Sequence, residues 1–247
     1  MKSARLIGPV AFVLLWALVT SLKLVDPLFV PSPLQVLGSL WQLFTHQAIY
    51  EDILSTLQRL SFGFAIGSLM GIILGIPAGY SERLHQSLEF LMDFFRSVPV
   101  TALFPLFLLF FGIGDVAKVA IVAWSSMLVV LLNTIYGVRN SRKMRVLVAQ
   151  SMKATNHQIF YRVIFPDSLP QIFVGLRTSL SLALIVVVVT EMFLGTTSGI
   201  GQRIFNSSLT YRVPEMYAAI LVAGIIGYSL NRIFAFFEKR FIHWSGK

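Results

Sequence analysis

This chain contains 247 residues, of which 56% are apolar and 13% charged; its formal net charge is +9 and it has no cysteine. Such a composition predicts an integral membrane protein without a separate soluble domain. The lack of cysteine excludes disulfide bonds, thiolate metal sites and cysteine nucleophiles. The positive charge does not indicate a nucleic-acid partner. Most of the 20 Lys and Arg residues fall in segments that a cytoplasmic N-terminus places in the cytoplasm, which is the positive-inside bias of membrane proteins.

Six apolar segments approach the length that a helix needs to cross the hydrocarbon core. We predict spans at about residues 6–24, 59–80, 88–112, 116–137, 171–194 and 215–237. The expected fold is therefore all-α and integral to a membrane, with six transmembrane helices in one domain over residues 1–247. An even number of spans places both termini in the cytoplasm, together with a polar loop at 138–170. No small-x-small cleavage site follows the first apolar run, so we expect this run to be retained.

A proline-rich turn follows the first predicted span. Residues 29–33 read Phe-Val-Pro-Ser-Pro, which indicates a rigid turn. The apolar periodicity of residues 34–44 predicts a short interfacial helix on the external side.

The second predicted span carries a glycine at every fourth position. These residues are Gly63, Gly67, Gly71, Gly75 and Gly79. Residues four apart share one helix face, so the glycines form a seam that another helix of the same subunit can approach closely. We interpret this glycine seam as a packing surface rather than as a substrate contact.

Two prolines interrupt the third predicted span. Pro99 and Pro105 are expected to kink a helix inside the membrane, and the freed carbonyl groups then need partners within the protein. Such a kink either lines a solute pathway or fits a curved neighbour. Asp93 and Arg96, three residues apart near the cytoplasmic end, are suited to a local ion pair. Arg96, Pro99 and Pro105 are pathway candidates.

The polar loop begins with the pattern of an amphipathic helix. One helical face collects Met144, Leu147, Val148, Ser151 and Met152. Basic and polar residues occupy the other faces. This segment is therefore expected to form a short helix outside the membrane.

A second short helix is expected directly afterwards. Thr155 and Gln158 have capping-box spacing, which predicts a helix start. Pro166 is expected to stop this helix. Ser168 and Gln171 repeat the capping spacing, so the next span should begin there, with its first turn including Pro170.

An acidic residue lies in the fifth predicted span. Glu191 follows Thr190 and precedes a glycine-rich turn at 195–201. Ionisable groups at membrane depth are costly, which makes them functional candidates. One interpretation is that Glu191 and Thr190 line the external half of a solute pathway. The other is that Glu191 is an internal partner of Arg96, of Arg203 or of a backbone amide at a broken helix end.

The chain lacks the motifs that would make it an enzyme. It has no Gly-x-x-x-x-Gly-Lys-Ser/Thr phosphate loop, no His-Glu-x-x-His and no Gly-x-Ser-x-Gly. Its four histidines, His46, His85, His157 and His243, are not spaced as a metal site. We therefore expect no catalytic, cofactor or metal site in this chain, and an energy source in another subunit.

The polar loop resembles the cytoplasmic EAA loop of ABC-transporter permeases of the binding-protein-dependent import class. In register with that pattern are Ala149, Ala154, Gln158, Ile159, Phe160, Val163, Ile164, Pro166, Leu169, Pro170 and Gly175. Leu147 replaces the family's Glu, and Lys153 replaces its Gly. Residues 96–114 and the turn at 29–33 resemble the nitrate, sulfonate, taurine and bicarbonate branch of this family. The resemblance thus covers residues 29–237.

The resemblance implies a type I ABC importer-like bundle in a bacterial inner membrane. It implies a homodimer of permeases, with a heterodimer as the alternative, and a periplasmic or lipid-anchored solute-binding protein. Two cytoplasmic ATPases would bind ATP and Mg²⁺. The cargo would be a small solute such as nitrate, a sulfonate, taurine, bicarbonate or a molecule like a thiamine precursor. Docking in a groove of the ATPase would use Met144, Leu147, Val148, Met152, Ile159 and Phe160 as anchors.

The two departures from the family pattern lead to further expectations. The groove that faces Leu147 is expected to be apolar. Because lysine is disfavoured in a left-handed backbone, the turn after Lys153 is expected either to shift to Asn156 or to be tighter than the family's. The alternative function is a secondary transporter that works without ATP. That class would show inverted repeats, and we find none in the sequence.

Overall fold

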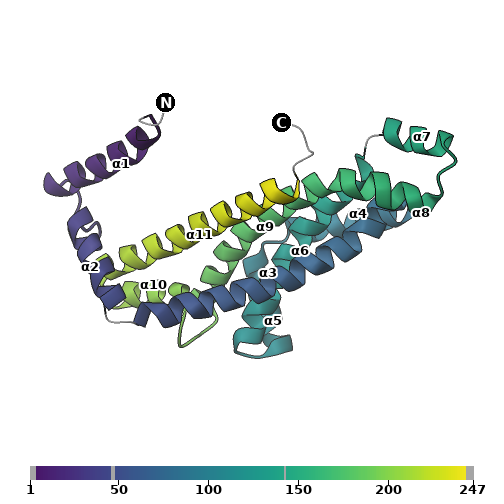
Figure 1. Ribbon diagram of the computed structural model, residues 1–247. Coiled ribbons are helices and arrows are strands. Elements are labelled where there is room, and N and C mark those ends of the chain that lie inside the picture. Colours follow the sequence, from purple (N-terminus) through teal and green to yellow (C-terminus); the bar gives the residue numbers. More distant parts are fainter. Residues whose placement is uncertain (1–3, 46–47, 142, 243–247) are drawn as a thin grey trace. The chain divides into compact units, whose positions relative to one another are not determined.

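The computed structural model of the protein describes residues 4–45, 48–141 and 143–242, and every regular element in these ranges is a helix (Figure 1). The all-α expectation is therefore confirmed for the described ranges. In chain order the elements are α1 Ala4–Ser21, α2 Pro33–Thr45, α3 Ala48–Tyr80, α4 Glu82–Ser97, η1 Val100–Leu103, α5 Phe104–Phe111, α6 Asp115–Arg139, α7 Lys143–Ser151, α8 Asn156–Ile159, η2 Phe160–Ile164, α9 Phe165–Phe193, α10 Ile200–Leu209 and α11 Val213–Phe241.

The chain forms two compact units. The first unit comprises residues 1–56 and 191–226, and the second unit comprises residues 57–190 and 227–247. Helices α3, α9 and α11 each contribute residues to both units. The seam and the polar loop belong to the second unit, whereas Glu191 and the turn after it belong to the first.

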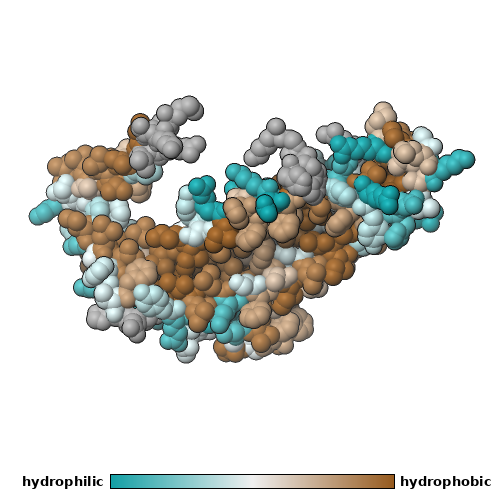
Figure 2. Space-filling model, viewed as in Figure 1, coloured by the Kyte–Doolittle hydropathy of each residue, from teal (hydrophilic) through white to brown (hydrophobic). Residues whose placement is uncertain are grey.

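Four helical stretches are long and apolar enough to cross a membrane: Ile49–Tyr80, Asp115–Arg139, Asn156–Phe193 and Val213–Phe241. Helices α4 and η1–α5 pass the same test together, but they are bent by 93° at the break between them. The described part of α1 is apolar but shorter. Apolar side chains cover much of the visible surface of the long helices (Figure 2). Within the described residues, length and composition thus support four spans, or five with the bent pair; the total of six stays a prediction.

Pro99 and Pro105 do not kink a continuous helix, as we had expected for residues 88–112. Helix α4 ends at Ser97, Pro99 precedes η1 and Pro105 lies at the start of α5. A residue before proline is disfavoured in the helical conformation, and Val98 is indeed extended. Proline itself is tolerated in a first helical turn, where its missing N–H costs nothing. The prolines therefore break the segment and restart it in a new direction.

The glycine seam of α3 lies against α6, and the two helices are side by side (Figure 1). A Cβ atom built on Gly67 would lie 2.2 Å from the carbonyl oxygen of Ala123. One built on Gly75 would lie 2.7 Å from the Cβ atom of Thr134. Only glycine leaves room for backbones this close.

Helices α3 and α6 run parallel to each other. Gly63 lies against Val122, and Gly79 lies against Val138, so the residue numbers of the contacts increase together along both helices. Parallel neighbours begin at the same end. The segment 81–114 between them must therefore return from the end of α3 to the level of its start.

Helix α9 runs antiparallel to α6. The backbone of Gly137 approaches the carbonyl oxygen of Ser168, and the backbone of Gly175 approaches the side chain of Asn133. The polar loop consequently connects the end of α6 to the start of α9, and these two helix ends lie at the same level.

The C-terminal part of α11 runs antiparallel to α9. Asn231 donates a hydrogen bond to Ser181 at 3.0 Å, and Arg177 is 3.6 Å from Glu238 in an ion pair. The end of α11 thus lies at the same end of α9 as the polar loop.

In the first unit, α1 and α2 pack against the start of α11. The indole ring of Trp16 stacks on the ring of Tyr217 with a centroid distance of 6.2 Å, and its N–H donates to the carbonyl oxygen of Pro31. Val36 of α2 is buried against Ala218 of α11. These contacts fix the turn at 29–33 and the direction in which α2 leaves it.

Helix α2 is amphipathic but exposes apolar side chains as well. Leu34, Leu37 and Trp41 are all more than half exposed, at positions that share one face. The opposite face carries the buried Val36 and Leu43. An exposed apolar face beside a buried one is the pattern of a helix that lies in the membrane interface.

Gly67→Ala is expected to destabilise the protein, because the added methyl group overlaps the backbone of α6. Overpacking of this kind costs about 1–3 kcal/mol. Gly224→Ala in α11 is the matched control, since no atom lies within 4 Å of its added Cβ and alanine favours a helix over glycine. Thermal unfolding in detergent measures both variants. Equal midpoints for the two would contradict close packing at the seam.

Candidate functional site

Helix α7 ends in a Schellman motif around Lys153. This residue has a φ of +58°, its N–H donates to Gln150 at 2.9 Å, and the N–H of Ala154 donates to Ala149 at 3.1 Å. These two hydrogen bonds define the motif. Our expectation that lysine would avoid the left-handed backbone is therefore wrong. The hydrogen bonds offset the conformational cost, and Lys153 takes the position that glycine has in the family pattern.

Helix α8 begins with the predicted capping box, which is confirmed. Thr155 Oγ1 accepts a hydrogen bond from the N–H of Gln158 at 3.3 Å, and Gln158 Oε1 accepts one from the N–H of Thr155 at 2.9 Å. The short helix continues into η2, a π-helical turn, and then into α9. The polar loop is thus joined to α9 without a break.

Pro166 does not stop the helix, contrary to our expectation. The N–H of Phe165 donates to the carbonyl oxygen of Phe160, five residues back, so the turn before Pro166 is wider than an α-helical turn. The wider turn leaves room for the proline ring, which in an α-helix collides with the preceding turn. Ser168, expected as a cap, lies inside α9 and donates to Phe165, and Pro170 also lies inside this helix.

Helix α7 presents an apolar ridge to solvent. The ridge consists of Met144, Leu147, Val148 and Met152, whose side chains are 70%, 55%, 54% and 78% exposed. Apolar side chains gathered in this way outside a lipid-facing helix indicate a surface that contacts another protein. We call these four residues the α7 ridge.

Two expected anchors face the subunit's own core instead. Ile159 is 4% exposed and packs with Val138 and Ile164. The ring of Phe160 lies 5.8 Å from the ring of Tyr80 in an edge-to-face contact. Both residues therefore fasten the loop to the subunit, and their contact with the ATPase stays a prediction.

The remaining residues of the loop support the ridge. Ala149 and Ala154 are half-buried against the Ile159 cluster. Arg145 of α7 forms an ion pair with Asp167 of α9. Of the other predicted loop residues, Gln158 is exposed, whereas Pro166, Leu169 and Pro170 are half-buried in α9. The ridge thus rests on a base that is fixed to the long helix α9.

Glu191 is fully buried and caps the N-terminus of α10. Its Oε2 accepts a hydrogen bond from the N–H of Gly201 at 3.0 Å, and both carboxylate oxygens lie 2.9 Å from the Thr56 hydroxyl that donates to them. The same hydroxyl accepts from the N–H of Ile200. The neighbouring Thr190 is buried too and donates to its own helix. A negative group at a helix N-terminus is favourable, and burial strengthens the interaction.

The position of Gly199 requires glycine for two reasons. Its φ is +135°, and a Cβ atom there would lie 2.5 Å from Cδ and 2.7 Å from each carboxylate oxygen of Glu191. Its N–H donates to Asp52 Oδ1 at 2.8 Å. Two carboxylates, from α3 and α9, therefore hold the connection into α10.

A chain of alternating charges continues from Asp52. Arg203 of α10 binds Asp52 through Nε and Glu215 through Nη1, the latter at 3.2 Å. Glu215 also binds Arg212 at 3.1 Å. Sequence reasoning had not connected these residues. The available signal was that Asp52 and Thr56 lie 11 and seven residues before Gly63, on the helix face that carries the seam.

Two buried basic side chains in the second unit were also missed. Arg59 lies 2.9 Å and Lys118 3.5 Å from Asp115, and the two basic side chains are 6% and 1% exposed. Arg59 precedes Gly63 by four residues, so the seam's face extends into a charged segment. These two ion pairs place basic groups at the start of α6.

Arg96 forms the predicted ion pair with Asp93, at 3.0 Å, and both side chains are largely exposed. The other pathway candidates of this segment, Pro99 and Pro105, lie at the break between α4 and α5. Among the described residues, no group of three or more His, Asp or Glu side chains is placed to hold a metal ion.

Gly199→Ala is expected to displace Glu191 and loosen the connection into α10. Gly195→Ala is the matched control, because its φ of +64° is also left-handed but nothing lies within 4 Å of the added Cβ. The control should be destabilised only by the backbone strain that alanine introduces, about 1–2 kcal/mol. Proteolysis between α9 and α10 and thermal unfolding compare the variants. Equal effects would show that the Glu191 contact does not matter.

Lys153→Gly is expected to stabilise the loop by about 1 kcal/mol, since glycine adopts the left-handed conformation without steric cost. Lys153→Val should destabilise it, because a β-branched residue is least tolerated there. Hydrogen exchange of the α7 amides measures the local stability. A slower exchange in the valine variant would contradict the Schellman motif.

The chain is similar to a known protein family and to individual transport proteins. The chain matches the family model described as binding-protein-dependent transport system inner membrane component over residues 67–243. The taurine transport system permease protein TauC of Escherichia coli is 29% identical over 247 residues, covering 98% of this chain and 90% of that protein. The nitrate import permease protein NrtB of Synechocystis sp. is 28% identical over 218 residues, covering 85% of this chain and 79% of that protein.

A solved structure supports the fold. The methionine ABC transporter MetNI in an inward-facing conformation is similar with a TM-score of 0.61 and 18% identity, over 82% of this chain and 96% of that chain. Its likeness covers helices on both sides of the polar loop, in agreement with the family match. The chain therefore belongs to the family of binding-protein-dependent transport system inner membrane components and is a permease of an ABC importer.

Proposed function

We propose that this permease couples ATP hydrolysis in a partner subunit to the passage of a small solute, through the α7 ridge. The observation that carries the proposal is the exposure of Met144, Leu147, Val148 and Met152 on a helix that is fastened to α9. An amphipathic helix with such a face is suited to a groove on another protein. ATP and Mg²⁺ would be bound by the ATPase, since the chain has no phosphate-binding loop.

The solute is proposed to be a small anion or zwitterion delivered by a binding protein. Relatives named for taurine and nitrate support this class. The other small solutes of the branch, bicarbonate, other sulfonates and molecules like thiamine precursors, belong to the same proposal. A secondary transporter that works without ATP is not favoured, because the family is defined by import with a binding protein.

We propose six spans with both termini in the cytoplasm of a bacterial cell and the chain in its inner membrane. The parallel packing of α3 on α6 supports one of these spans directly: if both helices cross the bilayer, residues 81–114 must cross it in the return direction. The bent pair α4 and η1–α5 then counts as the third span, and α1 as the first. This topology puts the polar loop and the end of α11 on the cytoplasmic side.

The coupling is proposed to travel along the helix from Asn156 to Phe193. This helix has 38 residues, or a length of about 57 Å at 1.5 Å per residue. It carries the fastened loop near one end and Glu191 near the other. A displacement of the α7 ridge would be passed to α9 through the Arg145–Asp167 ion pair and the Ile159 cluster, and α9 is continuous in sequence with the capped turn before α10.

The assembly is proposed to contain two copies of this permease, two ATPases and one solute-binding protein. A heterodimer with a second permease is the alternative. The candidates for residues that line the solute pathway stay the same: Glu191, Thr190, Arg96, Pro99 and Pro105. The burial of Glu191 supports a role in holding the turn at the outer end closed, rather than direct contact with the solute.

Met152→Asp is expected to abolish co-purification of the ATPase, because it buries a charge in an apolar contact. The effect of an unpaired charge in such a contact amounts to about 2–5 kcal/mol, which is more than tenfold in affinity. Gln150→Asp, a polar and exposed position on the same helix, is the control and should retain the ATPase.

The measurement is a pull-down from membranes in mild detergent, followed by an ATPase assay of the eluate. Monodisperse elution of both variants on gel filtration shows that they are folded. If the Met152 variant keeps its partner, or if the Gln150 variant loses it as well, the α7 ridge is not the coupling surface.

A further inference from the structure

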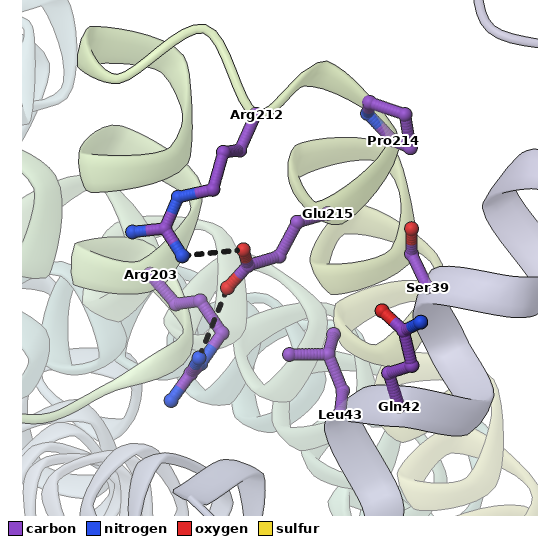
Figure 3. A pocket seen from close by; sticks show the side chains of 7 residues that line it. All are labelled: Ser39, Gln42, Leu43, Arg203, Arg212, Pro214 and Glu215. Carbon is purple, nitrogen blue, oxygen red and sulfur yellow. Dashed lines mark hydrogen bonds and ion pairs between the residues drawn. The ribbon is translucent and has the colours of Figure 1, made fainter. Parts of the chain in front are cut away.

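The first unit contains a cavity of about 460 Å³ between α2 and the start of α11 (Figure 3). Ser39, Gln42 and Leu43 line it from α2, and Pro214 and Glu215 line it from α11. Two arginines, from α10 and from the α10–α11 connection, complete the lining. This volume falls within the range that small-molecule sites occupy.

A chain of ion pairs borders this cavity, and its four charges alternate and sum to zero; Asp52 lies outside the lining, whereas the other three residues line the cavity. Asp52, Arg203, Glu215 and Arg212 are linked in that order by three ion pairs, two carboxylates with two guanidinium groups. In Figure 3 the carboxylate of Glu215 lies between the two guanidinium groups. A neutral cluster exerts little net attraction on a simple anion. It does present a positive and a negative group side by side.

Several donors at the cavity have no partner within the described residues. Arg212 uses Nε on Thr210 and Nη1 on Glu215, which leaves Nη2 without a hydrogen bond in the described part of the chain. The same holds for the hydroxyl of Ser39 and the amide of Gln42. The guanidinium of Arg212 is therefore held in place by two contacts while one edge stays available.

Two apolar side chains also line the cavity. Leu43 closes one side and the ring of Pro214 another, whereas the polar groups lie between them. A short aliphatic segment would fit beside these two side chains.

We infer that this cavity binds a small zwitterion, with a sulfonate or carboxylate group on Arg212, Gln42 and Ser39 and an ammonium group on Glu215. The inference deepens the proposed import of a small solute and rests on it. Charge-assisted hydrogen bonds to both ends explain why a neutral, dipolar cluster is built there. An anion without the ammonium group would leave Glu215 facing a like charge.

The location of the cavity suits the outer end of the permease. It lies at the connection between α10 and α11, which joins the fifth and sixth proposed spans. With the topology proposed above, a solute released from a binding protein would meet this cavity before it reaches the spans. The site would thus select zwitterions at the outer opening.

The test uses the purified permease–ATPase complex in nanodiscs, without a binding protein. Equilibrium dialysis measures binding of labelled taurine, which carries both charges, and of labelled ethanesulfonate, which lacks the ammonium group. Taurine is expected to bind at least about tenfold more tightly. Equal affinities for the two probes, or binding of neither by a complex that retains its ATPase, would overturn the inference and leave the importer assignment intact.

Two variants separate recognition from folding. Arg212→Gln is expected to weaken taurine binding by about tenfold, whereas Arg240→Gln, an exposed arginine at the other end of α11, should not change it. Glu215→Gln is expected to reverse the preference, so that ethanesulfonate binds more tightly than taurine. Misfolding lowers both affinities and cannot produce such a reversal. Unchanged taurine binding in the Arg212 variant, or an unchanged preference in the Glu215 variant, would overturn the inference.

Discussion

The close packing of the glycine seam on α6 is the constraint on which the rest of the second unit depends. It brings two backbones to a distance that no side chain allows, and it does so with the helices parallel. Parallel neighbours oblige the chain to return between them, which accounts for the broken segment at Pro99. The antiparallel α9 and α11 then bring the polar loop and the end of α11 to one end of these helices. If α3 and α6 both cross the bilayer, their parallel packing supports the proposed topology.

Polar groups, by contrast, organise the first unit. Glu191 and Asp52 satisfy the N-terminus of α10, and Arg203 and Glu215 extend the network toward α11. Burial makes each unsatisfied polar group costly in free energy. The hydrogen bonds and ion pairs of such a network are therefore expected to form or break together. This property would suit the proposed role of the segment, which is to hold the turn at the outer end closed. The long helix α9 links that segment to the coupling loop.

Much of this could be predicted from the sequence, because it depends on local patterns. The four-residue glycine spacing, the capping box at Thr155 and the ion pair of Asp93 and Arg96 are contacts within one helix face or one turn. The structure differs from the sequence-based predictions where several hydrogen bonds act together. Lys153 is left-handed because two backbone hydrogen bonds outweigh its steric preference, and a π-helical turn before Pro166 carries the helix past a residue that ends most helices. Contacts distant in sequence, such as the ion pair of Arg59 with Asp115, give no periodic signal.

The most direct test of the account exploits the absence of cysteine from the natural chain. Single variants Met152→Cys and Gln42→Cys would be treated in intact cells with a membrane-impermeant maleimide, and Met152→Cys would also be exposed to a short thiol cross-linker in membranes. The account predicts that Gln42→Cys is labelled from outside, whereas Met152→Cys is protected and cross-links to an ATPase. Labelling of Met152→Cys from outside, or a folded complex in which it never cross-links to an ATPase, would contradict the proposed topology and the coupling role of the α7 ridge.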